Sequence, residues 1–185
     1  MGILDRIRQT RSQREAERAE QEFHQQARSM DVNELRQLNS DELIEALLGR
    51  MQGKTQNLTE KEALEVLNEA QRTLYILKVF DEEVRTGGLL QFFVNDSRDL
   101  APYVSSSLKA VRADPYNKFF DDFVDRNSID LRDLSSFQID NLNEYELNIG
   151  RYPFDDFDGA FYYENLKNPL ERMLVIYARE HLQEM

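Results

Sequence analysis

The stretch TEKEALEVLNEAQRTLYILKVFDEEVRTGG, Thr59 to Gly88, decides the fold. It opens with the capping box Thr59-x-x-Glu62, in which each side chain accepts a hydrogen bond from the backbone N–H of the other residue. Apolar residues then recur at three- and four-residue steps, as on one face of a helix: Ala63, Leu67, Ala70, Leu74, Leu77 and Val84. The pattern predicts one helix of roughly 26 residues, about 39 Å long, as the spine of the domain.

Gly87 and Gly88 follow this helix. A glycine pair in that position supplies a left-handed cap and a sharp turn, although it also lets a partner approach the backbone closely. The side-chain amides of Gln91 and Asn95 are of the kind that tie turns together. We therefore predict a structural role for these four residues, with a short helix or a turn–helix junction after the glycines.

Further helices are predicted on both sides of the spine. Helical spacing and start signals mark residues 40–51, 101–113, 116–126 and 168–183. Residues 135–153 are irregular, and their alternation of apolar and polar residues at 145–149 allows at most one short strand. We expect a mainly α, single compact domain over residues 31–185, and a separate Arg/Glu-rich helix or tail over residues 1–30.

The composition excludes several classes of function. The chain has 185 residues, enough for one domain with a core, and its 11 Phe and 8 Tyr supply that core. It has no cysteine and only two histidines, far apart, and it lacks the motifs of nucleotide-binding, serine-hydrolase and zinc-protease sites. No catalytic residue, metal site or cofactor is therefore predicted. No apolar run reaches the roughly 18 residues of a membrane span, and a cytoplasmic protein is expected.

Negative charge is concentrated in one part of the chain. The net charge is −12, and residues 114–165 carry 13 acidic and 4 basic residues, an excess of nine negative charges. Direct binding of this region to nucleic acid is disfavoured, because the phosphate backbone has the same sign. The natural partner of such a region is a basic protein.

The stretch PFDDFDGAFYY, residues 153–163, first suggests a calcium loop. With Gly159 at the sixth loop position, however, the first position is Phe154 and the twelfth is Asn165, so the first ligand and the bidentate glutamate are missing. As a helix, the stretch gathers three phenylalanines on one face, turns Asp155 and Asp156 away from it, and leaves Asp158 at its flank. We therefore predict a helix here, with no metal site.

The stretch FFDDFVDR, residues 119–126, divides in the same way. Phenylalanines and a valine occupy one side, and the other side carries Asp121, Asp122 and Asp125. Carboxylates on one stripe repel one another by a few tenths of a kcal/mol per neighbouring pair, which a solvated face tolerates. A solvated face and a face that binds a basic groove both fit this pattern.

Three blocks of this sequence resemble the bacterial DNA-mimic-protein domain family: EEVRTGGLLQFFVND, FDDFDGAFYY and LVIYAREH. The matching residues are Gly87, Gly88, Gln91, Phe93 and Asn95 in the first block, Phe154, Asp155, Asp158 and Phe161 in the second, and Tyr177 and His181 in the third. Thr86 stands where the family usually has Asn. The resemblance covers about residues 40–183.

The resemblance implies an α-helical domain that, in at least one relative, presents acidic side chains in place of DNA phosphates and occupies a transcription factor's DNA site. On this basis we expect a non-enzymatic binding protein whose partner is a basic protein such as a DNA-binding transcription regulator. A homodimer, an uncharacterised metal-dependent hydrolase and a toxin-neutralising immunity protein stay open as alternatives. The residues expected to replace phosphates are Asp121, Asp122, Asp125, Asp130, Asp133, Asp155 and Asp156, while Asp158 is expected to be structural.

Overall fold

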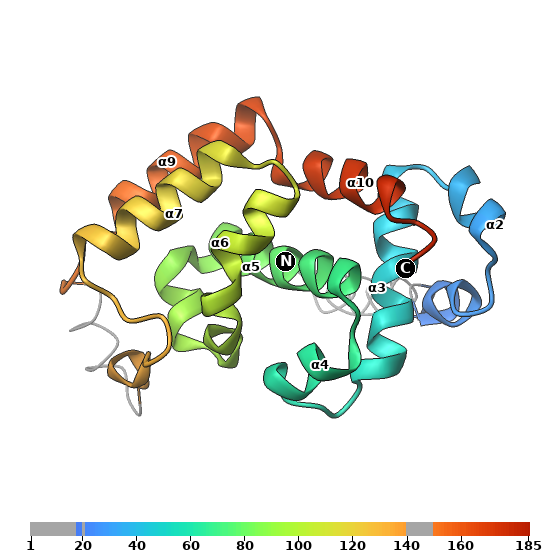
Figure 1. The fold of residues 1–185 in the computed structure, drawn as a ribbon, viewed down its shortest axis with the longest axis horizontal. Helices are drawn as coiled ribbons and strands as arrows, with labels where there is room; N and C mark the ends of the chain where they lie inside the picture. The colour runs from blue at the N-terminus through green and yellow to red at the C-terminus, as the bar shows by residue number, and fades with distance from the viewer. Residues whose placement is uncertain (1–17, 20, 140–149) are drawn as a thin grey trace, which may run out of the picture.

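Helix α5, Glu69–Val94, is the central element of the fold in the computed structural model, which describes residues 18–19, 21–139 and 150–185 (Figure 1). Helices α3, α6, α9 and α10 and the short helix η1 all pack against it. The bounds of the other elements are α2 Val32–Gln37, α3 Ser40–Thr55, α4 Glu60–Val66, η1 Asp96–Leu100, α6 Ala101–Ala110, α7 Asp114–Arg126, η2 Ser135–Phe137, α9 Phe154–Lys167 and α10 Leu170–Glu180.

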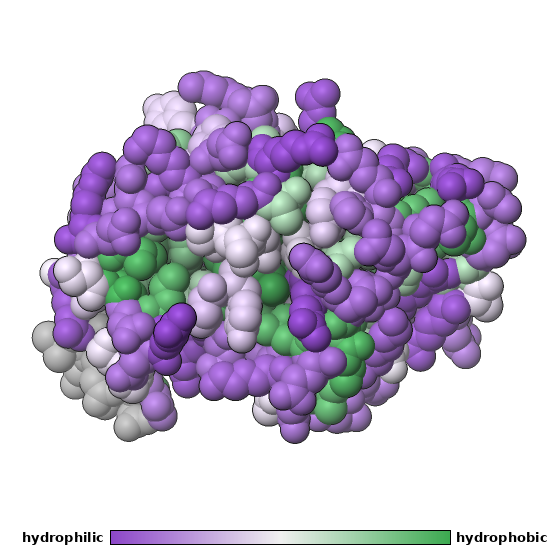
Figure 2. All heavy atoms as spheres, in the orientation of Figure 1, coloured by the Kyte–Doolittle hydropathy of each residue, from purple (hydrophilic) through white to green (hydrophobic). Residues whose placement is uncertain are grey.

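The prediction of a mainly α fold is confirmed, since the described part of the chain contains helices and no strand. The apolar–polar alternation at residues 145–149 lies outside the described residues. On the face shown in Figure 2 hydrophilic residues predominate, and hydrophobic residues reach the surface in several separate patches. None of the helices among the described residues combines the length and the apolar character that crossing a membrane requires.

The predicted spine is two helices rather than one. Thr59 caps α4 as expected, but α4 ends before Leu67, and Asn68 begins α5 with a capping box of its own. The Asn68 side chain accepts a hydrogen bond from the Gln71 N–H at 2.9 Å, and Gln71 Oε1 accepts one from the Asn68 N–H at 3.4 Å. All six apolar residues of the predicted stripe are buried nonetheless.

The prediction for the glycine pair is confirmed, because the long helix breaks there and a second, short helix follows it to Val94 within the element labelled α5. Gly87 has φ −145° and ψ 16°, and Gly88 has φ 78° and ψ 176°, so the helix is kinked here and resumes at Leu89. A positive φ costs residues with a Cβ atom roughly 1–2 kcal/mol, whereas glycine adopts it freely. The pair therefore ends the first helix in a sharp turn, after which the second helix begins.

Helices α7 and α9 run side by side in opposite directions (Figure 1). The rings of Phe123 and Phe154 are 5.3 Å apart at one end of the pair, and those of Tyr116 and Phe161 are 5.1 Å apart at the other. Phe80 of α5 contacts Phe161 edge-on at 5.9 Å. This aromatic core places the end of α7 next to the start of α9.

Residues 21–30 lie against α3. Ala27 is fully buried, and the Arg50 guanidinium of α3 donates to the carbonyl oxygens of Ala27, at 2.8 Å, and of Met30. His24 Nε2 lies 3.2 Å from Glu45 Oε2. The last third of the Arg/Glu-rich segment thus packs on the helical domain.

Asp81 of α5 is a carboxylate inside the core. Its side chain is 2% exposed, its Oδ2 accepts a hydrogen bond from Arg85 Nη1 at 3.2 Å, and its Oδ1 has no partner among the described residues. Burial raises the pKa of Asp81, and the Arg85 contact lowers it by less. The ionised carboxylate is therefore destabilising to the fold.

We expect Asp81→Asn to raise the free energy of unfolding at pH 7, on the order of 1 kcal/mol. Because the folded pKa of Asp81 lies above the unfolded one, the stability contributed by this side chain is lost as the pH rises from about 4 through the folded pKa, and the difference between the variant and the wild type grows over that range. Urea unfolding between pH 4 and 8 measures the difference, with Glu65→Gln on the exposed face of α4 as the control. A variant less stable at every pH would show that the Arg85 ion pair outweighs desolvation.

Candidate functional site

Asp158 of α9 holds the kink in α5. Its Oδ1 accepts a hydrogen bond from the Leu89 N–H at 2.9 Å, which caps the second part of α5. A Cβ atom on Gly88 would collide with Asp158 Oδ2. Burial raises the pKa of Asp158, the Leu89 N–H lowers it, and the nearby charge of Asp155 raises it. Gly88 and Asp158, which lie in different blocks of the sequence, therefore belong to one structural contact.

Glu83 joins the two parts of α5 across the kink. Its carboxylate accepts hydrogen bonds from Asn95 Nδ2 at 2.8 and 2.9 Å, from Gln91 Nε2, and from Ser97 Oγ at 3.4 Å. The Gln91 side chain also lies against Gly87, where a Cβ atom would collide with it. The sequence predicts a structural role for both amides but not for Glu83. No local pattern marks Glu83, because Gln91 and Asn95 come close to it only through the kink at Gly87 and Gly88.

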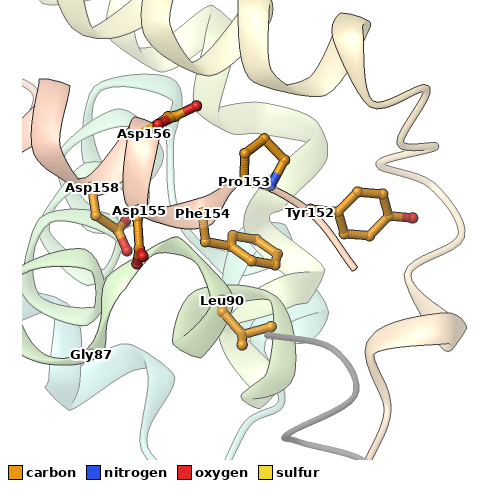
Figure 3. A pocket seen from close by; sticks show the side chains of 8 residues that line it. All are labelled: Gly87, Leu90, Tyr152, Pro153, Phe154, Asp155, Asp156 and Asp158. Atoms are coloured by element: carbon orange, nitrogen blue, oxygen red, sulfur yellow. The ribbon is translucent and has the colours of Figure 1, made fainter. Parts of the chain in front are cut away.

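A pocket of ≈ 400 Å³ opens between the kink and the start of α9, and we call it the kink pocket (Figure 3). Asp155 and Asp158 point to the same side, toward Gly87, whereas Asp156 points the opposite way. The rings of Phe154 and Tyr152 and the side chain of Leu90 supply much of its apolar lining. The two carboxylates give this pocket a negative wall.

A second pocket, of ≈ 310 Å³, lies between α7 and α9, and we call it the interhelical pocket. Its apolar lining comes from Phe119, Phe123, Phe157 and Ala160, and its polar lining from Lys118, Asp122, Arg126, Asn127 and Asp156, with Pro153 between them. Pro153 and Asp156 line both pockets. The first turn of α9 is therefore a ridge with a pocket on each flank.

The three predicted carboxylates of α7 do not share one stripe. Asp121 faces α6, where its Oδ2 lies 3.6 Å from Lys109 Nζ and accepts a hydrogen bond from Asn117 Nδ2 at 3.0 Å. Asp122 lies on the opposite flank and forms ion pairs with Lys118 and, at 3.4 Å, with Arg126. The hydrogen bond from Lys118 lowers the pKa of Asp122. Both charges are thus balanced within the molecule.

The third predicted carboxylate of α7, Asp125, is exposed, as are Asp155 and Asp156 of α9. Over residues 18–19, 21–139 and 150–185, no lysine or arginine nitrogen lies within 4 Å of their carboxylates. Asp125 lies at the end of α7, and Asp155 and Asp156 lie in the first turn of α9, which adjoins it. The structure brings these three to one end of the helix pair.

Asp130 and Asp133 lie in the turns that follow α7. Asp130 Oδ1 accepts a hydrogen bond from the Arg132 N–H at 2.9 Å, and Asp133 Oδ1 accepts one from the Ser135 N–H at 3.2 Å. Hydrogen bonds from Ser135 lower the pKa of Asp133. Both side chains are exposed, and they shape these turns as well as carrying charge.

The described residues contain no group of three His, Asp or Glu side chains arranged to hold a metal ion. No curated protein and no solved structure matches the chain significantly. A family model described as DMP19-like protein, where DMP stands for DNA mimic protein, matches residues 65–181, which include the kink, both pockets and all seven predicted carboxylates. This match spans more than half of the sequence, and the chain belongs to the DMP19-like protein family.

Proposed function

We propose that this protein is a non-enzymatic binding protein that occupies the DNA-binding surface of a basic protein, such as a transcription regulator. The observation that carries the proposal is the set of three exposed carboxylates, Asp125, Asp155 and Asp156, without a cationic partner among the described residues. They lie in a region with an excess of nine negative charges. The family name, which refers to a DNA mimic, supports the same function.

Ion pairing inside the molecule decides which carboxylates serve best as phosphate substitutes. A partner's arginine gains most from a carboxylate whose only counterions are in solution, because those ions are released on binding. Asp121 and Asp122 already have lysine or arginine neighbours and offer less. The contact is therefore centred on the end of α7 and the start of α9, with Asp130 and Asp133 next in the chain.

The size of the charged region agrees with one recognition element of a partner. Duplex DNA carries one negative charge per about 1.7 Å of its axis, so nine excess charges correspond to roughly 15 Å of duplex. That length covers one DNA-binding helix of a regulator. A partner of this kind places the proposed activity in the cytoplasm.

Capture from a bacterial lysate on the immobilised protein tests the proposal. We expect DNA-binding proteins to be retained at about 50 mM salt and released at about 0.5 M, where the Debye length falls to roughly 4 Å. Duplex DNA added to the lysate at low salt should prevent their retention, because both ligands need the same basic surface. Retained proteins that withstand both the salt and the DNA would contradict the proposed function.

A further inference from the structure

We propose that the interhelical pocket receives one large apolar side chain, such as leucine, from a basic helix of the partner. This inference rests on the proposed function and adds to it the feature that selects one basic partner among many. Its basis is an apolar pocket lined by Asp156, a carboxylate without a cationic partner among the described residues, while Asp125, a second such carboxylate, lies in the last turn of α7.

The size and lining of the pocket fit a single side chain. Its volume of ≈ 310 Å³ lies at the lower end of the roughly 300–1,000 Å³ of small-ligand sites, so it cannot take a whole helix. Phe123 and Phe157 are 6% and 4% exposed and belong to the core, whereas Phe119 and Ala160 are partly exposed. An apolar side chain that enters would cover the exposed parts of Phe119 and Ala160.

The charges around the pocket specify the neighbours of that side chain. On the α7 side, Lys118 and Arg126 hold Asp122 between them at four-residue steps, and this group of two cations and one carboxylate has a net charge of +1. Asp156 lines the opposite side, and Asp125 lies three residues from Asp122 on the same helix face. Asp125 and Asp156, which have no cationic partner among the described residues, attract arginine or lysine. The occupant is therefore an apolar residue with basic residues within one helical turn.

The apolar side chain in the pocket, which we call the anchor, would supply selectivity among basic partners that charge alone does not. Exposed ion pairs accelerate association and are weakened by salt, and they discriminate poorly among basic surfaces. Buried apolar residues at the centre of an interface carry much of its affinity and selectivity. A protein that relied only on its acidic residues would bind many DNA-binding proteins, whereas one with this pocket prefers those with a suitably placed apolar residue.

Two synthetic helical peptides rich in arginine and lysine, identical except for Leu or Ser at one central exposed position, test this. Fluorescence anisotropy with the full chain should show the Leu peptide binding at least about 10-fold more tightly. This ratio should persist at about 0.5 M salt even though both affinities fall, because burial of apolar surface is not screened.

Ala160→Trp should fill the pocket and remove the advantage of the Leu peptide over the Ser peptide. Tyr163→Trp, at an exposed position of α9 outside the pocket lining, is the matched control and should keep the advantage. If Ala160→Trp does not fold, Phe119→Ala provides a second variant, which should reduce the advantage by removing part of the lining.

The outcomes separate the two proposals. The two peptides could bind equally, and neutralising Asp125, Asp155 and Asp156 could weaken both. That result would support the charged contact and contradict the proposed apolar anchor. Absence of binding, or binding that ignores these carboxylates, would overturn the proposed function itself. Self-association of the wild type that Ala160→Trp abolishes in sedimentation would make a second copy the occupant and would also overturn the anchor.

Discussion

Gly88→Ala is expected to lower the free energy of unfolding by about 3 kcal/mol, the largest effect of any single substitution considered. Two costs add up. The residue adopts φ 78°, which costs a residue with a Cβ atom roughly 1–2 kcal/mol. The new methyl group would also push Asp158 away from the Leu89 N–H, and the loss of a helix cap costs about 1 kcal/mol. Urea or guanidinium unfolding followed by circular dichroism measures the change.

Gly159→Ala is the matched control, because it makes the same chemical change in a helix of the same site. A Cβ atom at Gly159 would have no neighbour within 4 Å, and the residue is exposed within α9. This substitution should raise the free energy of unfolding by roughly 0.5–1 kcal/mol. Equal effects of the two substitutions would contradict the assigned role of the kink. In an Asp158→Ala background Gly88→Ala should cost less, since the collision is gone.

The triple variant Asp125→Asn, Asp155→Asn, Asp156→Asn is expected to bind a captured DNA-binding protein roughly 100-fold more weakly at low salt. Three charged contacts of about 1 kcal/mol each account for that loss. The logarithmic dependence of affinity on salt should also become less steep, by about one for each contact removed. Isothermal titration calorimetry or anisotropy over a range of salt concentrations measures both quantities.

The control for this variant removes the same number of charges elsewhere. Asp41, Glu65 and Glu69 are exposed, and none of them forms an ion pair with a described lysine or arginine. The variant Asp41→Asn, Glu65→Gln, Glu69→Gln should bind within about threefold of the wild type, because rim and distant charges act mainly through long-range attraction. An equal loss in both triple variants would mean that net charge, not the α7–α9 end, determines binding.

The spine of the fold shows what sequence periodicity can and cannot predict. All six apolar residues from Ala63 to Val84 are buried as predicted, and Thr59 caps a helix as predicted. The break between α4 and α5 at Asn68 was not predicted, because the apolar spacing continues through it. Asn68-x-x-Gln71 is nevertheless itself a capping box. The kink had a sequence signal in Gly87-Gly88, but its geometry depends on Asp158, a residue 70 positions away in the chain.

The candidate site was less predictable than the fold for a related reason. Adjacent residues on a helix point about 100° apart, so Asp121 and Asp122 face different neighbours once α6 and α9 pack on either side of α7. The sequence of α7 alone does not show that Lys109 of α6 and Asp156 of α9 lie close to it in space. The same limit hid the role of Glu83, whose partners become close only when the chain turns at the kink.

The most direct test of the central claim is whether duplex DNA and this protein can occupy one DNA-binding protein together. A captured partner, purified and bound to fluorescent duplex DNA, would be titrated with the full chain in sedimentation-velocity experiments. The account predicts complete release of the duplex and no species that contains all three components. The triple variant at Asp125, Asp155 and Asp156 should need roughly 100-fold more protein for the same release. A stable ternary complex would contradict the account, because the DNA-binding surface would then be free.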